Sequence, residues 1–331
     1  MSTSLEPLLS VENLHTSFFT QNGTVKAVQE TSFAVQRGEI LGIVGESGCG
    51  KTTAGLSVMG LVPYPGRVVG GRINFRGTDL DEMDEDERRI LRGEAMAMIF
   101  QDPQAALNPL ITIGDQIAEI FNAHGRIDGD EVREETLVAL ASLGLPDPEY
   151  VMQSYPWEMS GGMCQRVMLA MMLVLEPELL IADEPTSALD VTLQAEILER
   201  LMGLAKESGT GIILITHDMG VIARAADKVL VMYGGRIVES ADTVTLFNNP
   251  KHPYTAGLLN AMPRLDRDTK PLPGIPGAPP DLLDAPDECP FLPRCNKATV
   301  VCRTNPMPPL VTMDEGHTLA CYNPLTEPRV G

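Results

Sequence analysis

The chain has 331 residues, of which 44% are hydrophobic and 21% charged, a composition typical of a globular protein and not of a disordered or fibrous one. This length predicts one large domain or a main domain with an appendage. Forty-five acidic against 25 basic residues give a formal net charge of −20; nucleic-acid phosphates and anionic lipid repel such a surface, so general nucleic-acid binding is disfavoured.

Two features of the sequence bear on its location. The longest apolar run, Val167 to Leu175, is far shorter than the roughly 20 residues needed to cross a hydrocarbon layer. The first residues lack the basic segment and apolar stretch of a signal peptide. We therefore expect a cytoplasmic protein that reaches the membrane only by docking on a protein partner.

The strand-like segments indicate an α/β fold. Residues 8–18 and 25–36 are predicted to form antiparallel strands of a smaller β layer. Later apolar runs alternate with helical patterns, which implies a largely parallel sheet with helices on its faces. These runs are ILGIVG at 40–45, MAMIF at 96–100, LLIAD at 179–183 and GIILITH at 211–217.

The helix-rich middle and the C-terminal part differ from this alternating pattern. Residues 111–125 and 132–144 have helical patterns, and we expect a protruding helical subdomain over about 104–175. The segment 263–286 is crowded with Pro and Gly, which predicts an irregular connection. The predicted organisation is a core domain over residues 1–249 and an extension over 250–331.

A phosphate-binding loop is predicted from Gly45 to Thr52, GESGCGKT, between a strand and a helix. Glycine permits the positive φ angles that let successive amides curl around phosphate. Lys51 can reach the outer phosphates, and Thr52 offers a hydroxyl to magnesium. The alternative, a glycine turn that binds nothing, is disfavoured by the strand and helix context. Cys49 is interpreted as a small tolerated side chain rather than a redox switch.

A second group of polar residues follows three of the predicted strands. Asp183, at the tip of LLIAD, would hold magnesium or its water, and Glu184 would polarise the attacking water. His217 could contact the terminal phosphate, although a histidine at a strand end is more often structural. Gln101 could bind magnesium or water; alternatively it is a solvated strand end.

The segment SGGMCQR, Ser160 to Arg166, resembles the signature of ABC ATPases. Together with the phosphate loop, Asp183, Glu184 and the sequence SALD from Ser187 to Asp190, it follows the order of that family's motifs. The resemblance covers residues 8–246 and implies a P-loop NTPase core. Met159 and Met163 stand where Leu and Gln are usual, and we interpret the methionine-rich helix that follows as ordinary core packing.

The resemblance implies specific roles for individual residues. Catalysis would involve Glu184, His217 and Gln101, and magnesium would be held by Thr52, Gln101 and Asp183. Phe18 would stack on adenine, although Phe18 or Phe19 could instead belong to the core. The nucleotide would contact Phe18, Gly45, Glu46, Ser47, Gly48, Cys49, Gly50, Lys51, Thr52, Thr53, Gln101, Ser160, Gly161, Gly162 and Asp183.

Finer features resemble the peptide importer branch of this family, with nickel importers as close relatives. They are MGLVPYPGRV at 59–68, IFQDPQAALNP at 99–109, MSGGMCQRVMLA at 159–170 and HPYTAGLL at 252–259. In that branch two different ATPase chains, whose signatures contact each other's ATP, pair beneath two membrane chains, and an external binding protein delivers substrate. The resemblance thus implies a peripheral protein on the cytoplasmic face of the membrane.

Four of the six cysteines, Cys289, Cys295, Cys302 and Cys321, fall in the extension. Cytoplasmic thiols stay reduced, which favours metal over disulfide. Their spacings do not match the paired two-residue spacing of zinc fingers, whereas four thiolates can hold a 4Fe-4S cluster, as the similar tails of peptide importer ATPases do. We favour iron–sulfur, then zinc, then plain thiols; the role would be a structural clip or, alternatively, redox sensing.

The predicted function is ATP hydrolysis that energises import of di- or oligopeptides. A nickel or other solute importer of the same branch is the first alternative. A soluble ABC ATPase of translation or DNA repair is disfavoured by the single cassette and the acidic charge, and a non-hydrolysing regulatory subunit by the presence of Glu184 and His217. The transported solute is not encoded in this chain.

Overall fold

The structure is a computed structural model that describes residues 6–125, 129–186, 190–262, 274–283, 285–314 and 316–326. The chain divides into two compact units. The first unit combines both ends of the chain, up to Asp81 and from Ile213 onward, and the second is the segment Glu82–Ile212. Within the described ranges no helix is both long and apolar enough to span a bilayer.

The first unit contains an antiparallel four-stranded sheet in the order β2-β1-β4-β5, which confirms the predicted antiparallel layer. The hairpin between β1 and β2 closes where the Thr20 hydroxyl donates to the Gly23 carbonyl over 2.8 Å and accepts from the Asn22 amide. Such side-chain bonds favour a tight turn. The strands are β1 (Leu9–Thr20), β2 (Gly23–Val35), β4 (Gly66–Phe75) and β5 (Thr78–Asp79).

The second sheet of this unit has the order β11-β12-β10-β9-β3-β8. Its central strands are rich in Ile, Leu and Val and, apart from Lys228 at the start of β9, buried throughout, as expected for strands covered on both faces. Strand β9 pairs parallel with β3 and antiparallel with β10. The strands are β3 (Ile40–Val44), β8 (Gly211–Thr216), β9 (Lys228–Tyr233), β10 (Arg236–Asp242), β11 (Val311–Asp314) and β12 (His317–Leu319).

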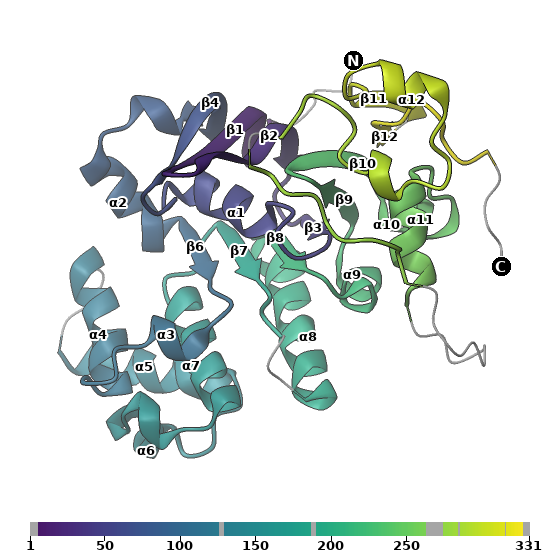
Figure 1. Ribbon diagram of the computed structural model, residues 1–331. Coiled ribbons are helices and arrows are strands. Elements are labelled where there is room, and N and C mark those ends of the chain that lie inside the picture. Colours follow the sequence, from purple (N-terminus) through teal and green to yellow (C-terminus); the bar gives the residue numbers. More distant parts are fainter. Residues whose placement is uncertain are drawn as a thin grey trace. The chain divides into compact units, whose positions relative to one another are not determined.

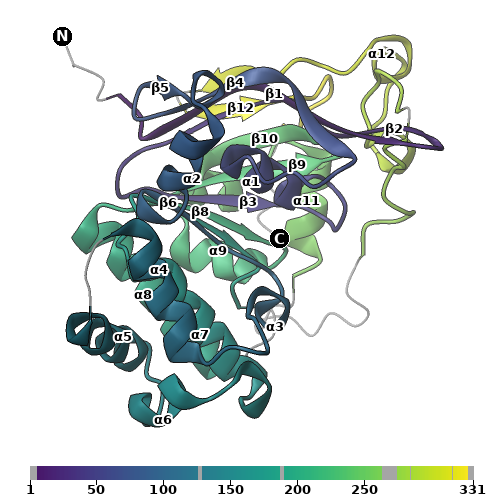
Figure 2. The ribbon, with the colours of Figure 1, turned by 90° about the vertical axis from the view of Figure 1, so that its left-hand side faces the viewer.

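Helix α1 (Lys51–Met59) lies between these two sheets in Figure 2. A buried hydrogen bond of 2.7 Å joins the hydroxyls of Thr16 in β1 and Ser57 in α1. This contact ties the C-terminal half of α1 to the antiparallel sheet. The other helical segments of the unit are α9 (Met219–Ala225), α10 (Thr243–Asn248), α11 (Pro253–Asn260), α12 (Val300–Thr304) and the 3-10 helices η1 (Leu80–Glu82), which extends one residue past Asp81, and η3 (Leu292–Arg294).

The second unit contains a parallel strand pair and several helices (Figure 1), of which α4, α5, α6 and α7 share an apolar core. Ile113, Ile117 and Phe121 of α4 pack in this core with Leu140 of α5, so the predicted helical stretches are confirmed. The elements are α2 (Glu85–Glu94), β6 (Met96–Ile99), α3 (Pro103–Ala106), α4 (Ile113–His124), α5 (Asp130–Ser142), α6 (Pro148–Gln153), η2 (Pro156–Glu158), α7 (Gly161–Leu173), β7 (Leu179–Asp183) and α8 (Val191–Ser208).

The C-terminal extension is anchored by a buried carboxylate. Glu239 of β10 accepts hydrogen bonds from the Lys251 amide at 2.6 Å, the His252 amide at 2.9 Å and Nε2 of His317 at 2.8 Å. Strand β12 pairs beside it, with Ser240 opposite Thr318. The extension therefore continues the sheet that carries the phosphate loop. Residues 263–273 and 284 of the predicted irregular connection lie outside the described residues.

Candidate nucleotide site

The predicted phosphate loop connects β3 to α1, and two of its glycines are required by close contacts. A Cβ on Gly45 would lie 2.2 Å from the Met232 carbonyl oxygen, and one on Gly50 would lie 2.3 Å from that of Ala27. Gly48 differs, since no atom lies within 4 Å of its Cβ position. All three have positive φ, at 155°, 79° and 103° in chain order. The loop thus has the conformation that only glycine adopts without strain.

Lys51 spans the loop. Its Nζ donates to the carbonyl oxygens of Gly45 at 2.8 Å and Glu46 at 3.1 Å, and the residue is buried. The Lys51 ammonium group is thereby held beside the loop amides. An anionic phosphate bound at the loop would interact both with the amides and with this ammonium group. Ser47, Gly48 and the first-turn residue Thr52 are exposed, and Thr53 is half-buried.

Cys49 points inward from this loop. Burial raises the pKa of its thiol although Lys51 acts in the opposite direction, and its Sγ lies 3.8 Å from Nζ of Lys51. A buried thiol with a raised pKa is a poor nucleophile. This supports the interpretation of Cys49 as a small side chain that the loop tolerates.

The second unit carries the two carboxylates and Gln101. Asp183 is buried as the last residue of β7, and Glu184 follows it with φ 50°, a left-handed backbone that is uncommon outside glycine and often marks functional positions. Strands β6 and β7 are parallel, with Ile99 opposite Ala182. Because parallel strands end at the same edge of a sheet, Gln101 and the two carboxylates lie at the same edge of this strand pair. Gln101 is exposed.

The signature begins helix α7, as the sequence predicts. The Ser160 hydroxyl caps the helix by accepting from the Met163 amide at 3.3 Å, and Gly161 is exposed with no atom within 4 Å of its Cβ position. Met159 is buried in the apolar core and Met163 packs against it, so the two unusual methionines are explained by packing.

Sequence reasoning missed Gln165. Its side-chain Nε2 donates to the Pro185 carbonyl, so the signature helix α7 is bonded to the peptide that follows Glu184. The residue is buried. A buried amide within an apolar helical pattern is the signal that could have identified it, since such a group needs a partner.

The remaining predicted residues are placed as follows. His217 is exposed directly after β8. Phe18 is half-buried with its ring against Gly66, whereas Phe19 is 42% exposed beneath Arg67, 4.5 Å from the ring centroid. Ser187, Ala188 and Leu189 of the SALD sequence lie outside the described residues.

The predicted nucleotide residues are thus divided between the units. Phe18, the phosphate loop with Lys51, and His217 belong to the first, and Gln101, Ser160, Asp183 and Glu184 to the second. Within each unit they lie at strand ends, helix starts or exposed loops. Their roles toward a nucleotide stay predictions.

The four cysteines of the extension line one cavity, together with His252, Phe291 and Tyr322. Burial raises the pKa of Cys289 to about 11 and of Cys321 to about 12, and neighbouring thiols add to both shifts. Among the described residues no three His, Cys, Asp or Glu side chains converge on a point that would hold a single metal ion.

Comparison with known families agrees with these motifs. A family model described as "ABC transporter" matches residues 28–187, and one described as "Oligopeptide/dipeptide transporter, C-terminal region" matches residues 238–302. Among solved structures, the dimeric structure of MJ0796, a bacterial ABC transporter cassette, is 25% identical with a TM-score of 0.65, and covers 71% of this chain and 98% of that chain.

Curated relatives match almost the whole chain. The dipeptide transport ATP-binding protein DppD of Bacillus subtilis is 47% identical over 319 residues, 96% of this chain and 95% of the relative. The oligopeptide transport ATP-binding protein OppD of Salmonella typhimurium is 47% identical over 320 residues, 97% of this chain and 95% of the relative. The chain therefore belongs to the ABC transporter ATPases, in the oligopeptide and dipeptide transporter branch.

Proposed function

We propose that this ABC-type ATPase uses ATP hydrolysis to energise import of di- or oligopeptides through membrane subunits with which it assembles. The observation that carries the proposal is the similarity to dipeptide and oligopeptide transport ATP-binding proteins over nearly the whole chain. The C-terminal extension matches the model for this branch as well. Both comparisons favour peptides over nickel or another solute.

Each predicted residue has a task in this reaction. The loop amides and Lys51 would bind the β- and γ-phosphates of ATP, and Glu184 would orient and polarise the attacking water. His217 would contact the γ-phosphate. A bound Mg²⁺ ion would neutralise charge on the phosphates, and its holders would be Thr52, Asp183 and Gln101.

The proposed assembly contains two ATPase chains. Ser160 and Gly161 are exposed at the start of a 13-residue helix, where free amides and the helix dipole attract phosphate. One chain with one set of motifs then needs a second, homologous chain to cap its nucleotide, and the MJ0796 cassette was solved as a dimer. Two membrane permeases and an external binding protein would complete a peripheral complex on the cytoplasmic face of the membrane.

Replacement of Glu184 tests the hydrolytic role. In the assembled complex, Glu184→Gln should lower ATP turnover by about 100-fold or more, because a positioned base contributes roughly 10²–10⁴-fold, while ATP binding persists. Glu176→Gln is a matched control, since Glu176 is exposed and also has positive φ in the same unit. Unchanged phosphate release by the Glu184 variant contradicts the assignment.

The substrate is tested with the reconstituted transporter. Peptides supplied through its external binding protein should stimulate ATP turnover and accumulate in vesicles, whereas Ni²⁺ should do neither. Stimulation by Ni²⁺ alone would replace the peptide proposal with the nickel alternative, and capture of ribosomes or DNA in place of membrane subunits would contradict both.

We further propose that Cys289, Cys295, Cys302 and Cys321 hold a 4Fe-4S cluster. Support comes from the shared cavity that all four line and from the suitability of four thiolates for such a cluster. The raised pKa values of Cys289 and Cys321 mean that cluster binding must release their protons.

Anaerobic purification of the full chain tests this cluster. We expect iron and acid-labile sulfide in equal amounts, and loss of both in Cys295→Ser. Cys164→Ser is the control, because Cys164 belongs to the second unit and is not one of the four cysteines of the extension. It is buried, and its thiol donates a hydrogen bond to the Pro156 carbonyl. Stoichiometric zinc without iron, or a metal-free chain, contradicts the proposal.

A further inference from the structure

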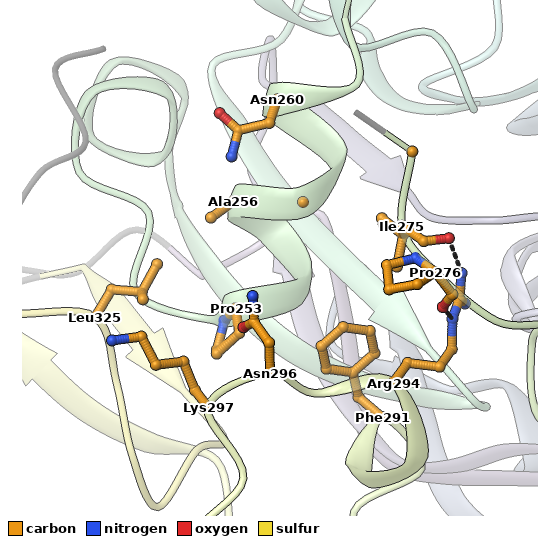
Figure 3. Close-up of a pocket in the computed structure, with 12 residues that line it drawn as sticks. Pro253, Ala256, Asn260, Ile275, Pro276, Phe291, Arg294, Asn296, Lys297 and Leu325 are labelled. Atoms are coloured by element: carbon orange, nitrogen blue, oxygen red, sulfur yellow. Dashed lines mark hydrogen bonds between the residues drawn. The ribbon is translucent and has the colours of Figure 1, made fainter. Parts of the chain in front are cut away.

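Arg294 of the C-terminal extension reaches the phosphate loop. It ends η3 between Cys289 and Cys295, and its side chain is 5% exposed. Figure 3 shows the guanidinium beside Phe291, with hydrogen bonds to the carbonyl oxygens of Ile275 and Pro276. Arg294 and Glu46 of the loop are 248 positions apart in the sequence, so only the folded state brings them together.

All five N–H donors of this guanidinium are used. Nε donates to the Pro276 carbonyl at 2.8 Å. One terminal nitrogen donates to the Tyr233 hydroxyl at 3.1 Å and to Oε2 of Glu46. The other donates to the Ile275 carbonyl at 3.2 Å and to Oε1 of Glu46 at 3.0 Å. The arginine therefore has one orientation, fixed by the extension, and presents a bidentate fork to Glu46.

Glu46 is the second residue of the phosphate loop and is held twice. Arg294 binds its carboxylate, and its backbone N–H donates to the Tyr254 hydroxyl of α11 at 2.8 Å. Tyr254 packs against Tyr233 and Phe291 with ring centroids 4.4 and 5.4 Å away. A rigid aromatic cluster and a saturated arginine thus fix the loop residue next to Gly45.

The charges make this contact relevant to nucleotide binding. A carboxylate in a phosphate loop repels a polyphosphate and would lower its affinity. The Arg294 cation neutralises this carboxylate, and the pKa of Arg294 is raised, chiefly by its hydrogen bonds to Glu46. Fixing the loop beforehand also removes an ordering cost that the nucleotide would otherwise have to offset.

We propose that Arg294 is a positioning residue for ATP: through Glu46, the C-terminal extension holds the phosphate loop in its binding conformation and sets its nucleotide affinity. The proposal rests on the proposed placement of the triphosphate at this loop. It gives the extension an indirect part, through Glu46, in nucleotide binding by this chain.

The test is a double-mutant cycle in the full-length chain, read by calorimetric titration with MgADP, which excludes turnover. Arg294→Met should weaken MgADP binding about tenfold or more, the effect of losing roughly 1.4 kcal/mol. The MgADP affinity of Arg294→Lys should lie between those of the native chain and Arg294→Met, because a lysine keeps the charge but not the bidentate hydrogen bonds. In a Glu46→Gln background, Arg294→Met should add little, since coupled residues are not additive.

Controls separate positioning from general stability. Arg303→Met removes an exposed arginine of the same extension and should leave MgADP affinity unchanged. Equal and additive losses in both backgrounds, or an unchanged affinity in Arg294→Lys and Arg294→Met, overturn the proposal. If Arg294→Met does not fold, Arg294→Lys in the two Glu46 backgrounds gives the same comparison.

Lys51→Ala separates the positioning role of Arg294 from the placement of the phosphates at this loop. If it abolishes MgADP binding while the Arg294 variants bind normally, only the positioning role is wrong. If Lys51→Ala also binds normally, the placement of the phosphates at this loop is wrong, and the positioning role falls with it.

Discussion

At the scale of single residues, His252 shows how the extension depends on a neutral side chain. It is fully buried, and its Nδ1 accepts a hydrogen bond from the Tyr254 amide at 3.1 Å, which caps α11. Burial lowers the pKa of His252 to about 3. Between that value and the usual pKa near 6.5, the unfolded chain binds a proton that the folded chain excludes.

Acid should therefore weaken the fold through His252. Stability rises with pH wherever the unfolded state holds more protons, by up to about 1.4 kcal/mol per pH unit for one group. His252→Asn keeps a capping acceptor but does not titrate. We expect its urea midpoint to fall less steeply than that of the native chain between pH 6.5 and 4.5; parallel pH dependences would show that His252 does not contribute.

At the scale of elements, the buried carboxylate of Glu239 joins three segments: β10, the start of α11 and β12. Strand β12 is three residues long, and so short a strand gains little stability from its own pairing. The carboxylate and its three donors are thus the main polar anchor of the described C-terminal strands.

Glu239→Leu should consequently destabilise the first unit by about 3 kcal/mol, since removing one partner leaves buried donors unpaired. The prediction is measured as a lower unfolding midpoint together with earlier proteolysis near β12. Glu288→Leu, an exposed change in the same extension, should leave both unchanged. Loss of stability without faster cleavage near β12 would place the anchor elsewhere.

Local pattern predicts some of these elements and not others. The helices α4 and α5 and the pair β1–β2 follow from periodicity over contiguous residues, and the glycine loop follows from a short motif. Strands β11 and β12 follow a Pro-rich segment. The residues of β11 are all exposed, and β12, which alternates between buried and half-buried residues, is three residues long, too short for its pattern to identify it. Strand β12 pairs with β10, which is distant in sequence, and β11 pairs with β12. Pairing with a distant strand depends on tertiary contacts.

The candidate site is divided in the same way. Lys51, Asp183 and Glu184 stand in motifs whose spacing carries their chemistry. Arg294 stands in no nucleotide motif, and Gln165 stands in the signature without a predicted role of its own. Their partners Glu46 and Pro185 are brought to them only by folding. Residues that would contact phosphate are therefore easier to identify from the sequence than residues that hold them in place.

At the scale of the whole molecule, the net charge of −20 makes the folded chain repel itself. Compact states concentrate this charge, and salt screens it over a Debye length of about 10 Å at 0.1 M. We expect the unfolding midpoint to rise between 20 mM and about 300 mM KCl, with most of the gain at the low end. A midpoint that is flat or falls over this range contradicts net repulsion.

The division of the chain has a consequence for synthesis. The second unit is one continuous segment, Glu82–Ile212, whereas the first unit needs both ends of the chain. On the ribosome, domains fold as their residues emerge. The second unit can therefore fold before β9, the partner of β3, has been synthesised. With the role proposed for Arg294, a nascent chain reaches its full nucleotide affinity only after Arg294 has left the exit tunnel, so tight binding of ATP is a late step in the synthesis of this protein.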